Sequence, residues 1–173
     1  MRFKKILKQI DKNGERYLLL PLYALIVSTV FMEVVRRSLL SYSSIWAEEI
    51  ARYAFIYVAW IGASAAIKQR AHIRIDVILN LCSPKFRALL YIFGDVVTLI
   101  LAVIAIYMSM EPVLNSIHFG SVTHGLRISH AWFLAAVPIG FAMMVFRILQ
   151  SMKRDWNDLR AGRPVFEGSK LFD

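Results

Sequence analysis

Six charged side chains lie near the junction of two long apolar blocks, where charge is unexpected. They are three acids and three bases: Glu33, Arg36, Arg37, Glu48, Glu49 and Arg52. A charge inside a membrane is costly unless it is paired, so each of these residues needs a partner or a function. Because only residues 41–44 separate the two blocks, we expect the six charges to neutralise one another in a structural network. A proton or substrate relay and a docking site for a partner are the alternatives.

The remaining residues with reactive side chains do not form a known active-site pattern. His118, His124 and His130 are evenly spaced, but histidines alone, without cysteines or a known zinc-loop fold, do not predict a metal site. The single cysteine, Cys82, excludes an internal disulfide and is expected to fill apolar space. The sequence contains no H-E-x-x-H, no phosphate-binding glycine loop and no nucleophile elbow. It therefore predicts neither an enzyme nor a bound cofactor.

Composition indicates a membrane protein. Hydrophobic residues make up 58% of the 173 positions and charged residues 19%, with a mean hydropathy of +0.53. Soluble domains are about half apolar and about a quarter charged. The net charge of +9 comes from basic residues that flank apolar blocks. They do not form a basic stripe with stacking aromatic residues, so we expect contact with membrane lipid and no nucleic acid.

Four apolar blocks are long enough to span a bilayer, at about residues 17–40, 45–67, 86–110 and 130–149. At ~1.5 Å per residue, helices of this length reach roughly 30–38 Å, which matches a hydrocarbon core of about 30 Å. The short 41–44 connection makes the first two helices an antiparallel hairpin. The sequence therefore predicts an all-α membrane protein with four transmembrane helices.

The distribution of lysine and arginine predicts the orientation. Six of these residues precede the first block, five lie between the second and third blocks or at the start of the third, and six lie at the C-terminal end. The first connection has none and the third has only Arg127. Basic connections stay in the cytoplasm. We therefore expect a multi-pass protein of a bacterial inner membrane with both termini cytoplasmic.

The chain divides into three parts around this transmembrane domain of residues 17–150. Residues 1–16 have the pattern of a basic amphipathic helix on the inner membrane surface. Residues 151–173 form a cytoplasmic tail that we expect to be loosely ordered. Between the second and third helices, residues 71–82 are too few to span the membrane and mix apolar with polar side chains. They predict an interfacial helix carrying His72 and Asp76, although their early alternation also suits a strand.

The second block carries two stripes at helical spacing. The small-residue stripe consists of Glu48, Arg52, Phe55, Ala59, Gly62 and Ala66. Small side chains let another helix approach closely in a membrane, so this stripe is expected to contact a partner subunit or the first helix. The aromatic stripe lies about 200° around the helix and consists of Trp46, Ile50, Tyr53, Tyr57 and Trp60. It predicts either a lipid-facing surface or a second protein contact.

These residues also resemble a known family, the small membrane subunits of the tripartite ATP-independent periplasmic (TRAP) transporters. The resemblance rests on the run Trp46-Ala-Glu48-Glu49-Ile-Ala-Arg52-Tyr53, then Gly62-Ala63, then His72-Ile73-Arg-Ile-Asp76. The four-helix layout agrees, so the resemblance covers roughly residues 15–150. Within the family the chain looks most like the sialic-acid systems.

The resemblance implies a transporter of three parts. A periplasmic binding protein captures an organic acid, here sialic acid, and a large elevator-type membrane subunit moves it with sodium ions. The sodium and substrate sites of the family belong to the large subunit, so this chain is expected to hold no catalytic, substrate or metal site and no cofactor. Its candidate residues are those of a subunit interface or structural charge network: Glu33, Arg36, Arg37, Glu48, Glu49, Arg52, Ala59, Gly62, Ala66, His72 and Asp76.

Two alternatives remain open at this point. A self-contained, proton-coupled multidrug-type exporter would use Glu33 as its carboxylate, but Arg36 and Arg37 lie one helical turn away and would hold it ionised. Asp95, the acid nearest the midplane of the membrane, has Arg147 as its best partner within the chain. A neutral Asp95 and a partner on another subunit are equally compatible with the sequence.

Overall fold

A computed structural model describes residues 2–69 and 84–163, with side chains from Asn13 to Gln69 and from Phe86 to Arg163. This part of the chain contains four helices: α1 (Arg2–Leu40), α2 (Ile45–Gln69), α4 (Pro84–His118) and α5 (Ala131–Arg160). All four contain a stretch long and apolar enough to cross a membrane. The prediction of an all-helical chain with four potential spans is confirmed, and the sidedness stays a prediction. The predicted interfacial helix lies outside the described residues.

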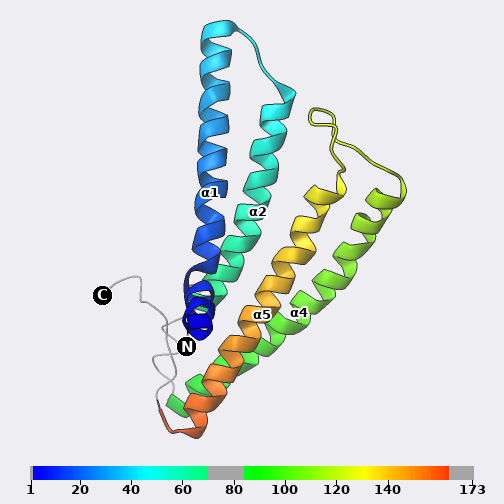
Figure 1. Ribbon diagram of the computed structural model, residues 1–173. Coiled ribbons are helices and arrows are strands. Elements are labelled where there is room, and N and C mark those ends of the chain that lie inside the picture. Colours follow the sequence, from blue (N-terminus) through cyan, green and yellow to red (C-terminus); the bar gives the residue numbers. More distant parts are fainter. Residues whose placement is uncertain (1, 70–83, 164–173) are drawn as a thin grey trace. The chain divides into compact units, whose positions relative to one another are not determined.

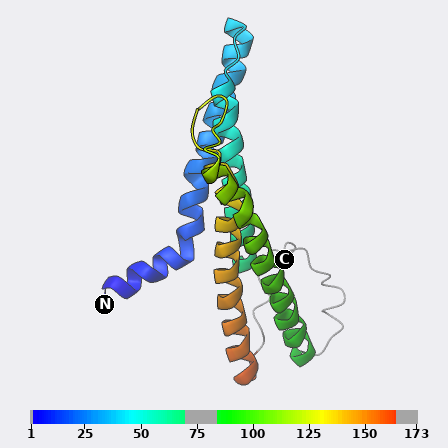
Figure 2. The same cartoon turned by 90° about the vertical axis from the view of Figure 1, so that its right-hand side faces the viewer.

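The helices are longer than the apolar blocks that predicted them (Figure 1). Helix α1 includes residues 2–16, whose sequence predicts a separate helix on the membrane surface, and Figure 2 shows a bend in this first part of α1. Helix α4 continues through Pro112 to His118. Val113 and Ser116 are buried, so the packed face of the helix continues beyond the proline. A proline removes only one backbone hydrogen bond, which such packing offsets.

Helix α5 runs to Arg160, so the expectation of a loosely ordered tail was wrong for residues 151–160. The polar residues Ser151 and Asp155 are buried there, which continues the packed face of the helix beyond the apolar block. Gly162 ends the helix in the left-handed region, with φ 65°. The N–H of Arg163 donates to the carbonyl of Asp158 over 3.0 Å. This hydrogen bond is typical of a glycine C-cap.

The chain forms two compact units, each built from parts of several helices. The first comprises residues 1–62 and 109–137, and therefore contains the α1–α2 hairpin, the end of α4, the 119–130 loop and the start of α5. Its interior includes the small or apolar residues Ala47, Ala54 and Ile61, spaced seven apart on α2. Ala131 and Ala136 of α5 are also buried. Small residues at these positions allow close helix packing.

The second unit comprises residues 63–108 and 138–173. Its described interior contains Ala88 and Ala102 of α4 and Ile148 of α5. Arg147 is buried and donates a hydrogen bond of 2.6 Å to Gln150 of its own helix. Asp155 is completely buried, 3.7 Å from the side chain of Arg154. The proposed pairing of Arg147 with Asp95 stays a prediction.

Burial is very unequal among the four helices. None of the most apolar stretch of α1 is buried within the chain, and only 6% of that of α4, against 22% for α2 and 28% for α5. The most apolar stretches of α1 and α4 therefore contain almost no residue that is fully buried within the chain. In a membrane protein, apolar surface that the chain leaves exposed meets lipid or another subunit.

Candidate functional site

The turn between α1 and α2 is closed by a carboxylate. Glu33 of α1 accepts the backbone N–H and the hydroxyl of Ser44, both over 2.7 Å. Arg36 donates to the same hydroxyl oxygen over 3.0 Å and lies 3.9 Å from the Glu33 carboxylate. Ser44 directly precedes α2, so this carboxylate fixes the start of the helix. Arg37 is exposed and makes no ion pair within the described part of the chain.

Glu49 has a different partner, the 119–130 loop. Its two carboxylate oxygens accept the backbone N–H groups of Gly125, over 2.8 Å, and Leu126, over 2.9 Å. Glu49 is only 9% exposed. Hydrogen bonds from two amide donors stabilise a buried carboxylate without a neighbouring cation. This contact ties α2 to a loop 76 residues further along the chain.

Gly125 is needed for this approach. A Cβ atom at this position would lie 2.9 Å from the backbone nitrogen of Trp46 and 3.0 Å from its Cα. Backbone atoms at the start of a helix cannot move aside as a flexible side chain can. The loop therefore lies close enough to α2 to reach Glu49 only because residue 125 has no side chain.

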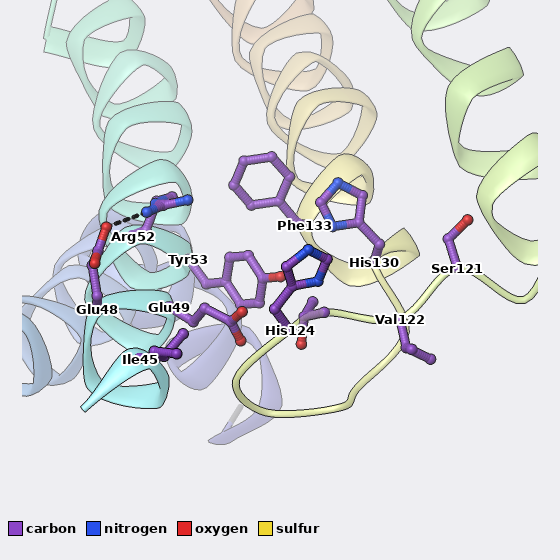
Figure 3. A pocket seen from close by; sticks show the side chains of 11 residues that line it. Ile45, Glu48, Glu49, Arg52, Tyr53, Ser121, Val122, His124, His130 and Phe133 are labelled. Atoms are coloured by element: carbon purple, nitrogen blue, oxygen red, sulfur yellow. Dashed lines mark hydrogen bonds and ion pairs between the residues drawn. The ribbon is translucent and has the colours of Figure 1, made fainter.

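The loop and the start of α2 enclose an open cleft of about 540 Å³ (Figure 3). The cleft is lined by Ile45, Glu48, Glu49, Arg52, Tyr53, Ser121, Val122, Thr123, His124, His130 and Phe133. Glu48 and Arg52 form an exposed ion pair one turn apart on α2, drawn as a dashed line. The two histidines lie on the loop side. Among the described residues no group of three or more His, Cys, Asp or Glu side chains could hold a metal ion.

Five of the six charges therefore form three separate groups, and Arg37 belongs to none of them, so the described residues do not form the single network that we expected. Glu33 and Arg36 hold the 41–44 turn, Glu48 pairs with Arg52, and Glu49 binds loop amides. The physical reason is that Glu33 and Glu49 accept hydrogen bonds from other donors and so need fewer cations. Glu33 accepts from the hydroxyl and N–H of Ser44, and Glu49 accepts from two backbone N–H groups of the loop. His72 and Asp76 lie outside the described residues.

The two stripes of α2 have different environments. On the aromatic stripe, Tyr57 donates to the backbone carbonyl of Trp132 over 2.7 Å, and the ring of Tyr53 lies 5.0 Å from that of Phe133. Part of this stripe thus packs on α5 within the same chain, so it is not a purely lipid-facing surface.

The small-residue stripe is open along its first part and partly covered at Gly62 and Ala66. Arg52, Phe55 and Ala59 are exposed, Phe55 to 62%. Gly62 and Ala66 are half-buried, and a Cβ on Gly62 would meet no atom within 4 Å. At 3.6 residues per turn the stripe lies about 180° from the face of Ala54 and Tyr57. The chain thus leaves room for another helix on this face of α2, which is exposed at Arg52, Phe55 and Ala59 and has open space beside Gly62.

Comparison with known proteins gives a consistent family match. Residues 26–158 match the family described as tripartite ATP-independent periplasmic transporters, DctQ component. The sialic acid TRAP transporter small permease protein SiaQ of Vibrio cholerae is 29% identical over 148 residues, which cover 86% of this chain and 84% of that protein.

Two longer relatives contain a similar segment. The sialic acid TRAP transporter permease protein SiaT of Haemophilus influenzae is 28% identical over 145 residues, covering 84% of this chain but 23% of that protein. The isethionate TRAP transporter permease protein DctMQ of Oleidesulfovibrio alaskensis is 26% identical over 153 residues, covering 85% of this chain and 24% of that protein.

A substitution at Gly125 tests the contact between the loop and α2. We expect Gly125→Ala to displace the loop from Glu49 and to destabilise the chain by about 1–3 kcal/mol, because the added methyl group meets fixed backbone. The measurement is the midpoint of thermal unfolding of the purified chain in detergent. Gly62→Ala is the control, since its methyl group meets open space. Equal midpoints for the two variants would contradict the close approach.

Proposed function

Because this chain belongs to the DctQ component family of the tripartite ATP-independent periplasmic transporters, we propose that it is the scaffold subunit of a sodium-coupled sialic acid importer. The family assignment makes it a small, multi-pass permease subunit of the bacterial inner membrane, partnered by a large permease subunit. It is a transporter component and not an enzyme.

The observation that carries the scaffold role is the open small-residue stripe of α2. Helix α2 packs its aromatic face on α5 of the same chain, and a Cβ on Gly62 of the stripe would meet open space. The stripe can therefore accept a second helix. The two longer relatives support direct contact, because a segment similar to this chain lies there within one larger permease protein. We propose that the large subunit binds along the stripe and carries the transport sites.

The proposed substrate rests on similarity. Two of the relatives above are named for sialic acid and one for isethionate. The resemblance to the family further supports sodium coupling in the large subunit and delivery by a periplasmic binding protein. We also propose that both termini lie in the cytoplasm, on the basis of the lysine and arginine distribution. A reporter enzyme that is active only in the periplasm, fused to either end of the chain, should therefore be inactive. Activity of either fusion would contradict this orientation.

The alternative of a self-contained exporter that uses Glu33 is not favoured. The Glu33 carboxylate already accepts two hydrogen bonds from Ser44, with Arg36 beside it, in the turn between two helices. A carboxylate that closes a turn in this way has a structural role, and the family match points to a transporter subunit.

The scaffold proposal predicts the effect of a bulky side chain on the stripe. Gly62→Leu should fold but hold the large subunit away from α2, so we expect the amount that co-purifies to fall about tenfold or more. Gly94→Leu on α4 is the matched control, because a Cβ there also meets nothing within 4 Å and the residue lies outside the stripe. If Gly62→Leu keeps a stoichiometric partner, the stripe is not the interface.

The substrate proposal predicts transport by the assembled system. Proteoliposomes containing both membrane subunits, supplied with the binding protein, should accumulate radiolabelled sialic acid when an inward sodium gradient is imposed. Replacing sodium by choline should abolish accumulation. Uptake that ignores sodium would contradict the coupling, and uptake of isethionate or a C4-dicarboxylate in preference to sialic acid would contradict the substrate.

A further inference from the structure

The cleft beside Glu49 lies where two membrane spans begin. Helices α2 and α5, which both contribute to its lining, start at Ile45 and Ala131, and each is long and apolar enough to cross a membrane. The second residue of each helix is an exposed tryptophan, Trp46 to 44% and Trp132 to 66%. Tryptophan is enriched at the ends of spans, at the level of the lipid headgroups. The cleft is therefore at the boundary of the bilayer, where a lipid headgroup can enter it.

The ion pair on the α2 side of the cleft has hydrogen-bonding capacity to spare. Within the described residues, the hydrogen bond of the pair uses Nη2 of Arg52 and Oε1 of Glu48. A guanidinium has five N–H donors and a carboxylate has two oxygens, so each side chain can bind a further group. The two side chains are 56% and 71% exposed. An exposed pair adds at most about 1 kcal/mol to stability, so the fold does not depend on keeping it closed.

The rest of the lining suits a molecule with a polar and an apolar part. His124 and His130 line the loop side of the cleft (Figure 3). Each imidazole has at least one N–H to donate, whether or not it is protonated. Val122 and Phe133 add apolar surface. The volume of about 540 Å³ also falls in the range of small-ligand sites, roughly 300–1,000 Å³.

We propose that the cleft binds the headgroup of a zwitterionic phospholipid, with its phosphate at Arg52 and its primary ammonium at Glu48. The charges of the lining select this class. Among the described residues that line the cleft, Arg52 faces two carboxylates, Glu48 and Glu49, so an anionic lipid would meet an excess of negative charge. A headgroup that carries both a phosphate and an ammonium matches the ion pair in both signs. This site is separate from the proposed transport function and does not depend on it.

Native mass spectrometry of the purified chain, titrated in detergent with defined lipids, tests the proposal. We expect phosphatidylethanolamine to bind at about tenfold lower concentration than phosphatidylglycerol, which has no ammonium, or phosphatidylcholine, whose quaternary ammonium has no N–H for Glu48. Arg52→Gln should raise the half-saturating concentration of phosphatidylethanolamine about tenfold, because the charge-assisted hydrogen bond to the phosphate is lost. Glu48→Gln should remove the preference for phosphatidylethanolamine over phosphatidylglycerol. Lys153→Gln, an equal loss of charge at an exposed site on α5, is the control and should match the wild type.

Two further measurements keep the test independent of folding and of the acyl chains. Phosphatidylethanolamine should raise the midpoint of thermal unfolding of the wild type and of Lys153→Gln, and Arg52→Gln should unfold at the lipid-free midpoint of the wild type with or without this lipid. Soluble glycerophosphoethanolamine, which has the same headgroup, should not displace the lipid at equal concentration. If it does, the cleft binds a free zwitterion and the lipid assignment is wrong. Equal binding of the three lipids by the wild type, or unchanged binding in Arg52→Gln, would overturn the proposal.

Discussion

Helices in a membrane gain little from exchanging lipid for protein at an apolar surface, so they associate where small side chains permit close approach or where polar groups meet partners. In this chain α2 satisfies both conditions on different faces. Its aromatic face meets α5 through Tyr57 and Tyr53, and its first turns hold the 119–130 loop through Glu49. The face that carries Ala59 and Gly62 is left open. The assignment of a scaffold role depends on this division of one helix.

The sequence was sufficient to predict four membrane spans, because length and hydropathy are local properties of each block. The ends of the helices were not predicted, because burial in the folded chain determines them. The polar residues Ser116 and Ser151 and the charged Asp155 lie in helical turns that continue a packed face. Gly120 and Gly162 could have predicted where α4 and α5 end, because both adopt the left-handed conformation just after these helices.

The candidate site was predicted only in part. Helical spacing grouped the residues of the small-residue stripe, since spacing alone determines which side chains share a face. The partners of the charges were not predictable in the same way. Glu49 binds backbone amides far along the chain, and every non-proline residue carries such a donor, so no residue type marks it. The only local hint was Gly125 within the third connection, where a glycine allows close backbone approach.

Site-specific photo-crosslinking in the native host would show whether the small-residue stripe of α2 binds the large permease subunit. A photoreactive amino acid would replace Ala59 on the stripe or, as a control, Ile61, which is buried within this chain. We expect a crosslink to a large multi-spanning protein from position 59 and none from position 61. If position 59 gives only lipid adducts or a dimer of this chain, while both variants assemble normally, the stripe does not bind the large subunit.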